Sequence, residues 1–298
     1  KNLYKYNNIE TFSPENIGKY SCKIKKILDN IKDCRGIIFI YSQFIDAGII
    51  PLALALEHHG YKRYGNNQLL NSPNKVKPTT PMGNYIMITS ETGGGGLSFN
   101  FKKHMNILNS NDNKNGEKIK IILGSPAASE GLSFLRVREI HILDPWHNFN
   151  RIEQAIGRGI RTCSHKDLPL EERNVTVYYY ASIIDDNMDL GSSEDILDME
   201  TVDLKTYRIA VNKVFKIAEV EHMIKKNAID CNLMKENNFI KSDPRLTNRT
   251  IETSKNKTVK VDIFDKDYSR NCNYKVCDYK CYPPEEELGD EDDINRDT

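Results

Sequence analysis

Five short, mostly apolar runs, separated by stretches with helical patterning, constrain the fold of this chain more than any other feature. The runs lie at residues 36–41, 84–89, 119–123, 139–144 and 175–180. Apolar runs of this length are typical of strands covered on both faces, and intervening helices are typical of parallel connections. The alternation predicts an α/β domain with a doubly wound, mostly parallel sheet that ends near Ile184.

Three of the intervening stretches are expected to be helical, and one is not. Residues 19–33, 45–59 and 97–108 place apolar side chains at helical spacing. Residues 61–82 are rich in Asn, Pro and Lys and show no periodicity. We therefore expect residues 61–82 to be an exposed insertion.

The charge balance and the cysteine usage exclude several classes of protein. The 298 residues include 42 basic and 42 acidic side chains, so the net charge is zero. Any contact with nucleic acid must therefore come from a local basic patch. No apolar run approaches the length of a membrane-spanning helix, so no membrane association is expected. The seven cysteines are odd in number and mostly scattered, which is typical of reduced intracellular thiols rather than of a disulfide framework.

The stretch from residue 124 to residue 165 concentrates the residues that suggest chemistry. Residues 125–131, SPAASEG, follow an expected strand and combine hydroxyl groups with a flexible glycine. Further on, Gln154, Arg158 and Arg161 are spaced to share one face of a helix. Two guanidinium groups and an amide on one narrow face suit a phosphate ligand. A solvated cationic face near a helix C-terminus would give the same pattern.

The order of these pieces resembles motifs V and VI of superfamily 2 helicases, which lie in the second of their two RecA-like domains. The resemblance implies that Arg158 and Arg161 reach the γ-phosphate of ATP held by the other domain, with Gln154 on the same face. It also implies that Gly131 and Gly157 belong to the cofactor-binding surface. The loop that ends at Gly131 would be motif V, which touches the nucleic-acid backbone in that family.

Residues 124–180 resemble a narrower group, the helicase-related ATPases of nucleocytoplasmic large DNA viruses. This group is related to the poxvirus early transcription factor small subunit and nucleoside triphosphatase. One position departs from the wider pattern, because Ala155 stands where many superfamily 2 helicases have Arg. The resemblance implies an intracellular protein of the host cytoplasm or viral factory. Packaging in the virion and a contact with the viral RNA polymerase are further expectations.

Polar residues at the expected carboxyl ends of the strands form the expected nucleic-acid surface. Ser42 and Gln43 follow the first strand and resemble helicase motif IV, although a simple helix N-cap explains them equally well. Thr89, Ser90 and Ser125 follow two other strands. These five residues are expected to meet the backbone of DNA or RNA without reading bases.

A run of four glycines at residues 93–96 also follows a strand and precedes an expected helix. The dinucleotide-binding pattern G-x-G-x-x-G fails here, because Ser98 stands at its third glycine. A flexible loop that contacts the nucleic-acid backbone is the favoured interpretation.

Two elements that an ATP-hydrolysing helicase needs are missing from the sequence. Neither the phosphate cradle G-x-x-x-x-G-K-[ST] nor an acidic pair after an apolar strand occurs. We therefore expect ATP and Mg²⁺ to be held mainly by an N-terminal RecA-like domain, in the same polypeptide or in trans, and this chain alone to be inactive. A start at Lys1 without Met favours a fragment of a longer helicase. The alternative is a non-catalytic subunit that uses a helicase-like domain to bind nucleic acid or a polymerase.

Composition and patterning divide the chain into four parts. Residues 1–184 form the expected RecA-like domain, 185–200 an acidic linker, 201–284 a helical extension with a Cys-rich tail, and 285–298 an acidic disordered tail. Within the extension, residues 201–228 carry an apolar stripe at helical spacing, which is expected to pack on the sheet domain.

Four of the cysteines lie in this extension. Cys272, Cys277 and Cys281 are close together in the sequence, and Cys231 lies just after the long helical stretch. Four thiols could form a tetrahedral structural zinc site. The spacing departs from the usual C-x2-C pairs, and the tail has no histidine, so buried thiols without metal are the alternative.

Overall fold

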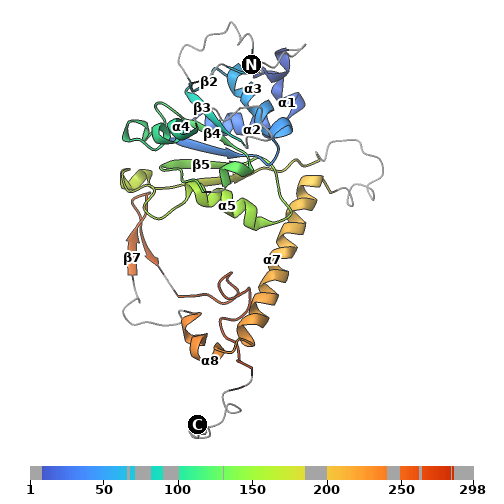
Figure 1. Cartoon of the computed structure of the whole chain (residues 1–298), viewed down its shortest axis with the longest axis vertical. Helices are drawn as coiled ribbons and strands as arrows, with labels where there is room; N and C mark the ends of the chain where they lie inside the picture. The colour runs from blue at the N-terminus through green and yellow to red at the C-terminus, as the bar shows by residue number, and fades with distance from the viewer. Residues whose placement is uncertain are drawn as a thin grey trace, which may run out of the picture. The chain divides into compact units, whose positions relative to one another are not determined.

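Figure 1 shows the computed structural model of the chain, which forms two compact units at Lys1–Arg208 and Ile209–Thr298. We call these the first unit and the second unit. The structure describes residues 9–65, 68–70, 82–89, 101–129, 131–184, 200–239, 249–261, 264–282 and 284. The expected acidic linker, apart from Glu200, and the expected acidic tail lie outside the described residues.

A six-stranded sheet organises the first unit. Its strands are β1 Ile37–Tyr41, β2 Lys62–Arg63, β3 Asn84–Ile88, β4 Ile121–Gly124, β5 Val137–Ile142 and β6 Thr176–Tyr179. They lie in the order β2-β3-β4-β1-β5-β6, and every pair of neighbours is parallel. The first strand of the chain is therefore central in the sheet. This RecA-like α/β arrangement confirms the predicted fold class, and the five predicted strands are all present.

Helices cover both faces of this sheet (Figure 1). The first unit contains α1 Ile17–Tyr20, α2 Cys22–Ile31, α3 Ile50–His58, α4 Phe101–Leu108 and α5 Phe149–Gly159. A π-helical turn, Ile45–Ile49, precedes α3, and short 3₁₀ turns lie at Ile9–Phe12, Asn111–Asn113, Pro126–Ser129 and Leu170–Glu172. The predicted helices at 19–33, 45–59 and 97–108 are therefore present in shortened or divided form, with residues 97–100 outside the described ranges.

Alternate residues of β1 contribute to two separate hydrophobic cores. Ile38 and Ile40 pack on one face with the apolar side of α2 and with α3. Ile37 and Phe39 pack on the other face, against α4 and α5. Successive side chains of a strand point to opposite faces, so a run without polar residues is what a strand with two covered faces requires. All five residues of β1 are buried.

The predicted exposed insertion at 61–82 is wrong in its first part. Tyr61 and the pair Leu69 and Leu70 are buried, and β2 extends the sheet beside β3. Glu57 of α3 explains the difference, because its carboxylate accepts the backbone N–H groups of Leu69 and Leu70, each at 2.8 Å. Residues 66–67 and 71–81 lie outside the described residues.

Glu57 also provides a pH-dependent contribution to stability. Burial raises the pKa of this carboxyl group above its ordinary value, although hydrogen bonds from Leu70, Tyr85 and Leu69 act to lower it. A raised pKa in the folded state means that the folded protein binds more protons than the unfolded chain between the two values. The free energy of unfolding therefore falls as pH rises through this window.

We expect Glu57→Gln to remove this part of the pH dependence. Urea unfolding between about pH 5 and pH 8 should give the wild type a steeper loss of stability with pH than the variant. The exposed residue Glu171 provides the control, and Glu171→Gln should leave the wild-type slope in place. A wild-type slope in Glu57→Gln would show that other groups carry the dependence.

The second unit has little core of its own. It contains most of α7 Val202–Lys226, together with α8 Cys231–Met234, a 3₁₀ turn at Lys235–Asn237 and a hairpin of β7 Arg249–Glu252 and β8 Thr258–Val261. The predicted helix at 201–228 is confirmed, but its apolar stripe is not buried as expected. Of its side chains, only Ala210 and Ala218 are buried, whereas Phe215 is 47% exposed. No helix in the described ranges has the length and apolarity that crossing a membrane requires.

The four cysteines of the extension form two disulfides in the second unit. Cys231 pairs with Cys281 and Cys272 pairs with Cys277, with Cα–Cα distances of 5.7 and 4.9 Å. All four are buried beside Phe239 and Tyr279 in one small cluster. The expectation of reduced thiols is therefore wrong for these four. The described residues contain no grouping of three or more His, Cys, Asp and Glu suited to a metal, and zinc at these cysteines stays a prediction.

Candidate functional site

The two predicted arginines meet at one backbone carbonyl. Arg158 Nη1 donates a hydrogen bond to the carbonyl oxygen of Leu132 at 3.3 Å, and Arg161 Nη2 donates to the same oxygen at 3.2 Å. Arg161 Nε also donates to the carbonyl of Gly157 at 3.2 Å. The loop that begins at Gly131 and the end of α5 therefore meet through these guanidinium groups.

The helix α5 ends at Gly159, so the expectation that Gln154, Arg158 and Arg161 share one helix face is wrong for Arg161, which lies just beyond the helix. The sequence of α5 explains why Gln154 and Arg158 face outward. Its N-terminus is capped by Asn148, whose side chain accepts from the N–H of Asn150. Ile152, Ala155 and Gly159 are the buried residues of the helix. Ala155, the position that departs from the expected motif, lies in the core. The face that carries Gln154 and Arg158 is left toward solvent, and Gln154 itself is exposed.

The two predicted glycines differ in the structural reason for having glycine at the position. Gly131 has a φ of +65°, a conformation that favours glycine and that turns the loop so that the Leu132 carbonyl meets the arginines. At Gly157 an added Cβ would meet no atom within 4 Å. Gly157 therefore leaves open space beside the arginines, and packing inside the described residues does not require it.

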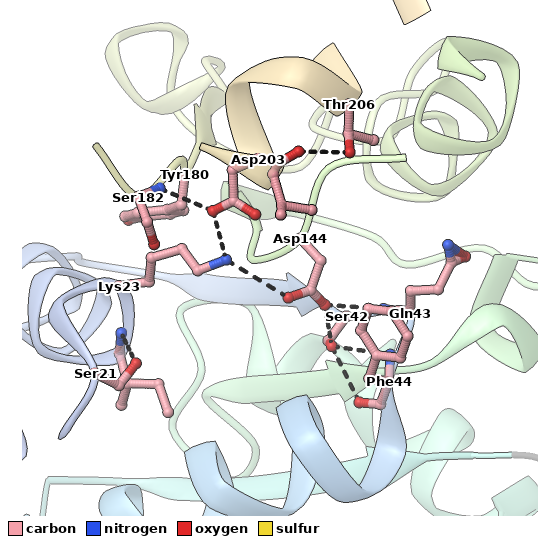
Figure 2. Close-up of polar contacts among 12 residues, drawn as sticks. Ser21, Lys23, Ser42, Gln43, Phe44, Asp144, Tyr180, Ser182, Asp203 and Thr206 are labelled. Atoms are coloured by element: carbon pink, nitrogen blue, oxygen red, sulfur yellow. Dashed lines mark hydrogen bonds and ion pairs between the residues drawn. The ribbon is translucent and has the colours of Figure 1, made fainter. Parts of the chain in front are cut away.

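A second polar group joins the carboxyl ends of β1 and β5 (Figure 2). Asp144 accepts a short hydrogen bond from Ser42 Oγ and another from the N–H of Gln43 at 3.2 Å. Lys23 Nζ of α2 lies 2.9 Å from Asp203 and 3.9 Å from Asp144. The N–H of Ser182 donates to Asp203 at 2.8 Å. These contacts connect α2, two strand ends and the start of α7 within the first unit.

The two carboxylates of this group have opposite pKa shifts. Burial raises the pKa of Asp144, against hydrogen bonds and the Lys23 charge that lower it. Burial also acts to raise the pKa of Asp203, but the Ser182 N–H and Lys23 together outweigh it and lower that pKa. The shifts agree with the distances, because Lys23 lies closer to Asp203. Asp203 is therefore the main ionic partner of Lys23, and Asp144 mainly fixes the backbone after β1.

The predicted nucleic-acid residues that the structure describes lie together at the carboxyl edge of the sheet. The N–H of Ser42 donates to Gly124, and the N–H of Ser125 donates to Ile88, both at 3.0 Å. Ser42, Thr89 and Ser125 are buried. Ser90 lies outside the described residues, as does the glycine run.

Two of the predicted nucleic-acid residues have a buried side-chain group with no hydrogen-bond partner among the described residues. These groups are the amide nitrogen of Gln43 and the hydroxyl of Ser125. Buried polar groups without partners are costly, and such groups are characteristic of sites that bind a ligand or change state. Parallel α/β sheets bind ligands at this edge.

Sequence comparison relates the chain to proteins of large DNA viruses. It is 36% identical over 237 residues to a protein of Acanthamoeba polyphaga mimivirus named as an ATP-dependent RNA helicase, covering 78% of this chain and 37% of that protein. It is 31% identical over 273 residues to a helicase of Invertebrate iridescent virus 3, covering 89% of this chain and 24% of that protein. This chain is a helicase-family viral protein. A termination factor NPH-I homologue of African swine fever virus is 28% identical over 79% of the chain and 36% of its own length.

The helicase-family chain therefore spans between 24% and 37% of the length of these three relatives. No protein-family model matches it. The C-terminal part of the Fun30 ATPase domain superposes on 70% of the chain and 60% of that structure, at 16% identity and a TM-score of 0.38. That likeness is too low to add to the sequence relationship.

Arg151 is a residue at the carboxyl edge of the sheet that the sequence interpretation missed. It lies on α5 three positions before Gln154, so the helical spacing that selected Gln154 and Arg158 extends to it. Its guanidinium lies 5.2 Å from the ring centre of Trp146 and donates to Gln43 Oε1 at 3.1 Å. Arg151 thereby fixes the side-chain oxygen of Gln43, so the side-chain amide nitrogen of Gln43 points away from Arg151.

Proposed function

We propose that this chain is the second RecA-like half of an ATP-dependent nucleic-acid helicase or translocase, with Arg158 and Arg161 as its arginine fingers. The observation that carries the proposal is the convergence of both guanidinium groups on the Leu132 carbonyl beside Gly131. ATP and Mg²⁺ would be held mainly by an N-terminal RecA-like domain, in cis or in trans.

The Leu132 carbonyl, which both arginines contact, is a partner that a phosphate can replace. A carbonyl is a neutral acceptor, whereas hydrogen bonds from guanidinium to phosphate are charge-assisted and roughly twice as strong. Arg161 is exposed and forms no ion pair with a carboxylate among the described residues. Gln154 lies exposed on the same side of α5, where its amide can assist in orienting the phosphate or the attacking water.

The proposed nucleic-acid contact lies at the carboxyl edge of the sheet. Gln43 and Ser125 carry it, because their polar side-chain groups are unpaired among the described residues; both groups are buried, so the proposed contact with phosphate oxygens requires this edge to open when nucleic acid binds. Ser42 and Thr89 are buried at the same edge, and Ser90 stays a predicted contact. Contacts of this kind position DNA or RNA without reading its sequence.

A role in viral transcription is proposed together with this activity. The African swine fever virus relatives are named as termination factor homologues, which favours the viral RNA polymerase as a partner. The proposed place of action is the host cytoplasm or viral factory. The alternative function, a subunit that binds nucleic acid or polymerase without ATP turnover, would use the same edge of the sheet.

ATP turnover separates the two functions. We expect the purified chain alone to give no turnover above background, because the phosphate cradle and the acidic pair are absent from its sequence. A chimera in which this chain replaces the matched region of the mimivirus relative should hydrolyse ATP and respond to nucleic acid. A folded chimera that binds nucleic acid but gives no turnover would favour the non-catalytic subunit. Turnover by the chain alone would contradict the proposed division of the ATP site.

A further inference from the structure

The hairpin of β7 and β8 in the second unit is exposed on both faces. Arg249 pairs with Val261, and Ile251 pairs directly with Val259 in an antiparallel register. All four residues of β7 and three of the four residues of β8 are exposed. The turn is closed by a hydrogen bond from the N–H of Thr253 to the carbonyl of Lys257 at 2.9 Å.

A two-stranded ribbon of this kind cannot bury a core of its own. Its one apolar pair remains open, because Ile251 is 53% exposed and Val259 is 44% exposed. Its own ladder and turn contribute to holding this hairpin together. An ordered, uncovered ribbon is suited to contact a partner.

The charge of the hairpin identifies the kind of partner. Residues 249–261 contain four basic side chains and one acidic side chain, whereas the whole chain has a net charge of zero. Lys255, Lys257 and Lys260 are exposed, and none of the three forms an ion pair in the part of the chain that the structure describes. Two of these lysines lie in the turn, so the positive charge is concentrated at the tip.

We propose that the hairpin is a second nucleic-acid contact, in which Lys255, Lys257 and Lys260 bind backbone phosphates. This inference rests on the proposed function of the first unit. Three lysines on a short ribbon can reach successive phosphates, and such binding depends on charge rather than on sequence. A protein partner would be favoured by a broad apolar face, and here the apolar surface is limited to the Ile251–Val259 pair and its edges.

The test measures binding of the full chain to a fluorescent single-stranded RNA and to a DNA duplex over a range of salt concentrations. The triple variant Lys255→Gln, Lys257→Gln, Lys260→Gln should bind about 100-fold more weakly at about 0.1 M salt. The slope of log affinity against log salt should decrease by about two to three. The control variant Lys62→Gln, Lys114→Gln, Lys166→Gln removes the same charge from exposed positions of the first unit and should change the slope little.

A third protein, Gln43→Ala with Ser125→Ala, separates this inference from the proposed function. Loss of affinity in this double variant, with an unchanged slope in the hairpin variant, would overturn the hairpin contact and leave the sheet edge as the nucleic-acid site. A loss of affinity in the hairpin variant alone would support the hairpin contact and contradict the contact at the sheet edge. Absence of binding by the wild type would overturn both. Far-UV circular dichroism confirms that each variant retains its fold.

Discussion

Replacing Arg161 by alanine should lower ATP turnover of the chimera by about a thousandfold, because an arginine finger contributes on the order of 10³-fold or more to phosphoryl transfer. The guanidinium stabilises charge that develops on the γ-phosphate only in the transition state, so the loss should appear mainly in kcat. Nucleic-acid affinity should change by less than about threefold, because Arg161 lies just after the end of α5 and is not one of the predicted contacts at the sheet edge.

Arg173 provides a matched control for this experiment. It is exposed, and its guanidinium donates to the carbonyls of Leu168 and Lys166, as that of Arg161 donates to Leu132 and Gly157. Arg173→Ala therefore removes the same kind of contact and should leave turnover near the wild-type level. Arg161→Lys keeps the charge but loses the planar fork, and it should recover only a small part of the activity. Equal losses of turnover and nucleic-acid affinity in Arg161→Ala would show that Arg161 binds the nucleic-acid backbone.

Removing the Cys231–Cys281 disulfide should unfold the second unit while the first unit remains folded. The two cysteines are 50 residues apart, and closing a loop of that size stabilises the folded state by about 4 kcal/mol. The unit depends on this contribution, because its buried cluster consists of the four cysteines, Phe239 and Tyr279. Small domains with so little core need such a covalent or metal constraint.

Two signals follow the two units separately in this experiment. The single Trp of the chain is Trp146 in the first unit, so its fluorescence should be unchanged in Cys231→Ser with Cys281→Ser. The helical circular dichroism signal should decrease, because most of α7 lies in the second unit. The Cys272–Cys277 disulfide closes a loop of only five positions. Its removal in Cys272→Ser with Cys277→Ser should therefore lower the stability of the second unit by about 2 kcal/mol. The exposed thiols Cys22 and Cys163 provide a control pair.

Metal analysis decides between the disulfides and the predicted zinc site. With disulfides, a reductant should reproduce the unfolding of the second unit, and a chelator should have no effect. With zinc, one metal ion per chain should be found, and the chelator should unfold the unit while the reductant does not. A second unit that stays folded after both treatments would contradict both accounts.

The sequence by itself determined the elements whose pattern is local. The β1 run is apolar at every position, and α5 places Ile152 and Ala155 opposite Gln154 and Arg158. Such periodicities fix the type of each element and the face that it buries, because they depend on neighbours a few residues away. The predicted sheet, and the outward face of α5 that carries Gln154 and Arg158, follow from that information, whereas Arg161 lies beyond the end of the helix.

The tertiary structure alone decided the contacts between distant segments. Glu57 draws Leu69 and Leu70 into the core, which composition had assigned to an exposed insertion. Asp144 binds Ser42 across 102 positions of sequence, and Arg151 orients Gln43 across 108 positions. Hydrogen bonds and ion pairs of this kind depend on which strand ends become neighbours, and no local periodicity encodes that order. The sequence therefore identified the arginines, and only the folded chain showed that both meet at the Leu132 carbonyl.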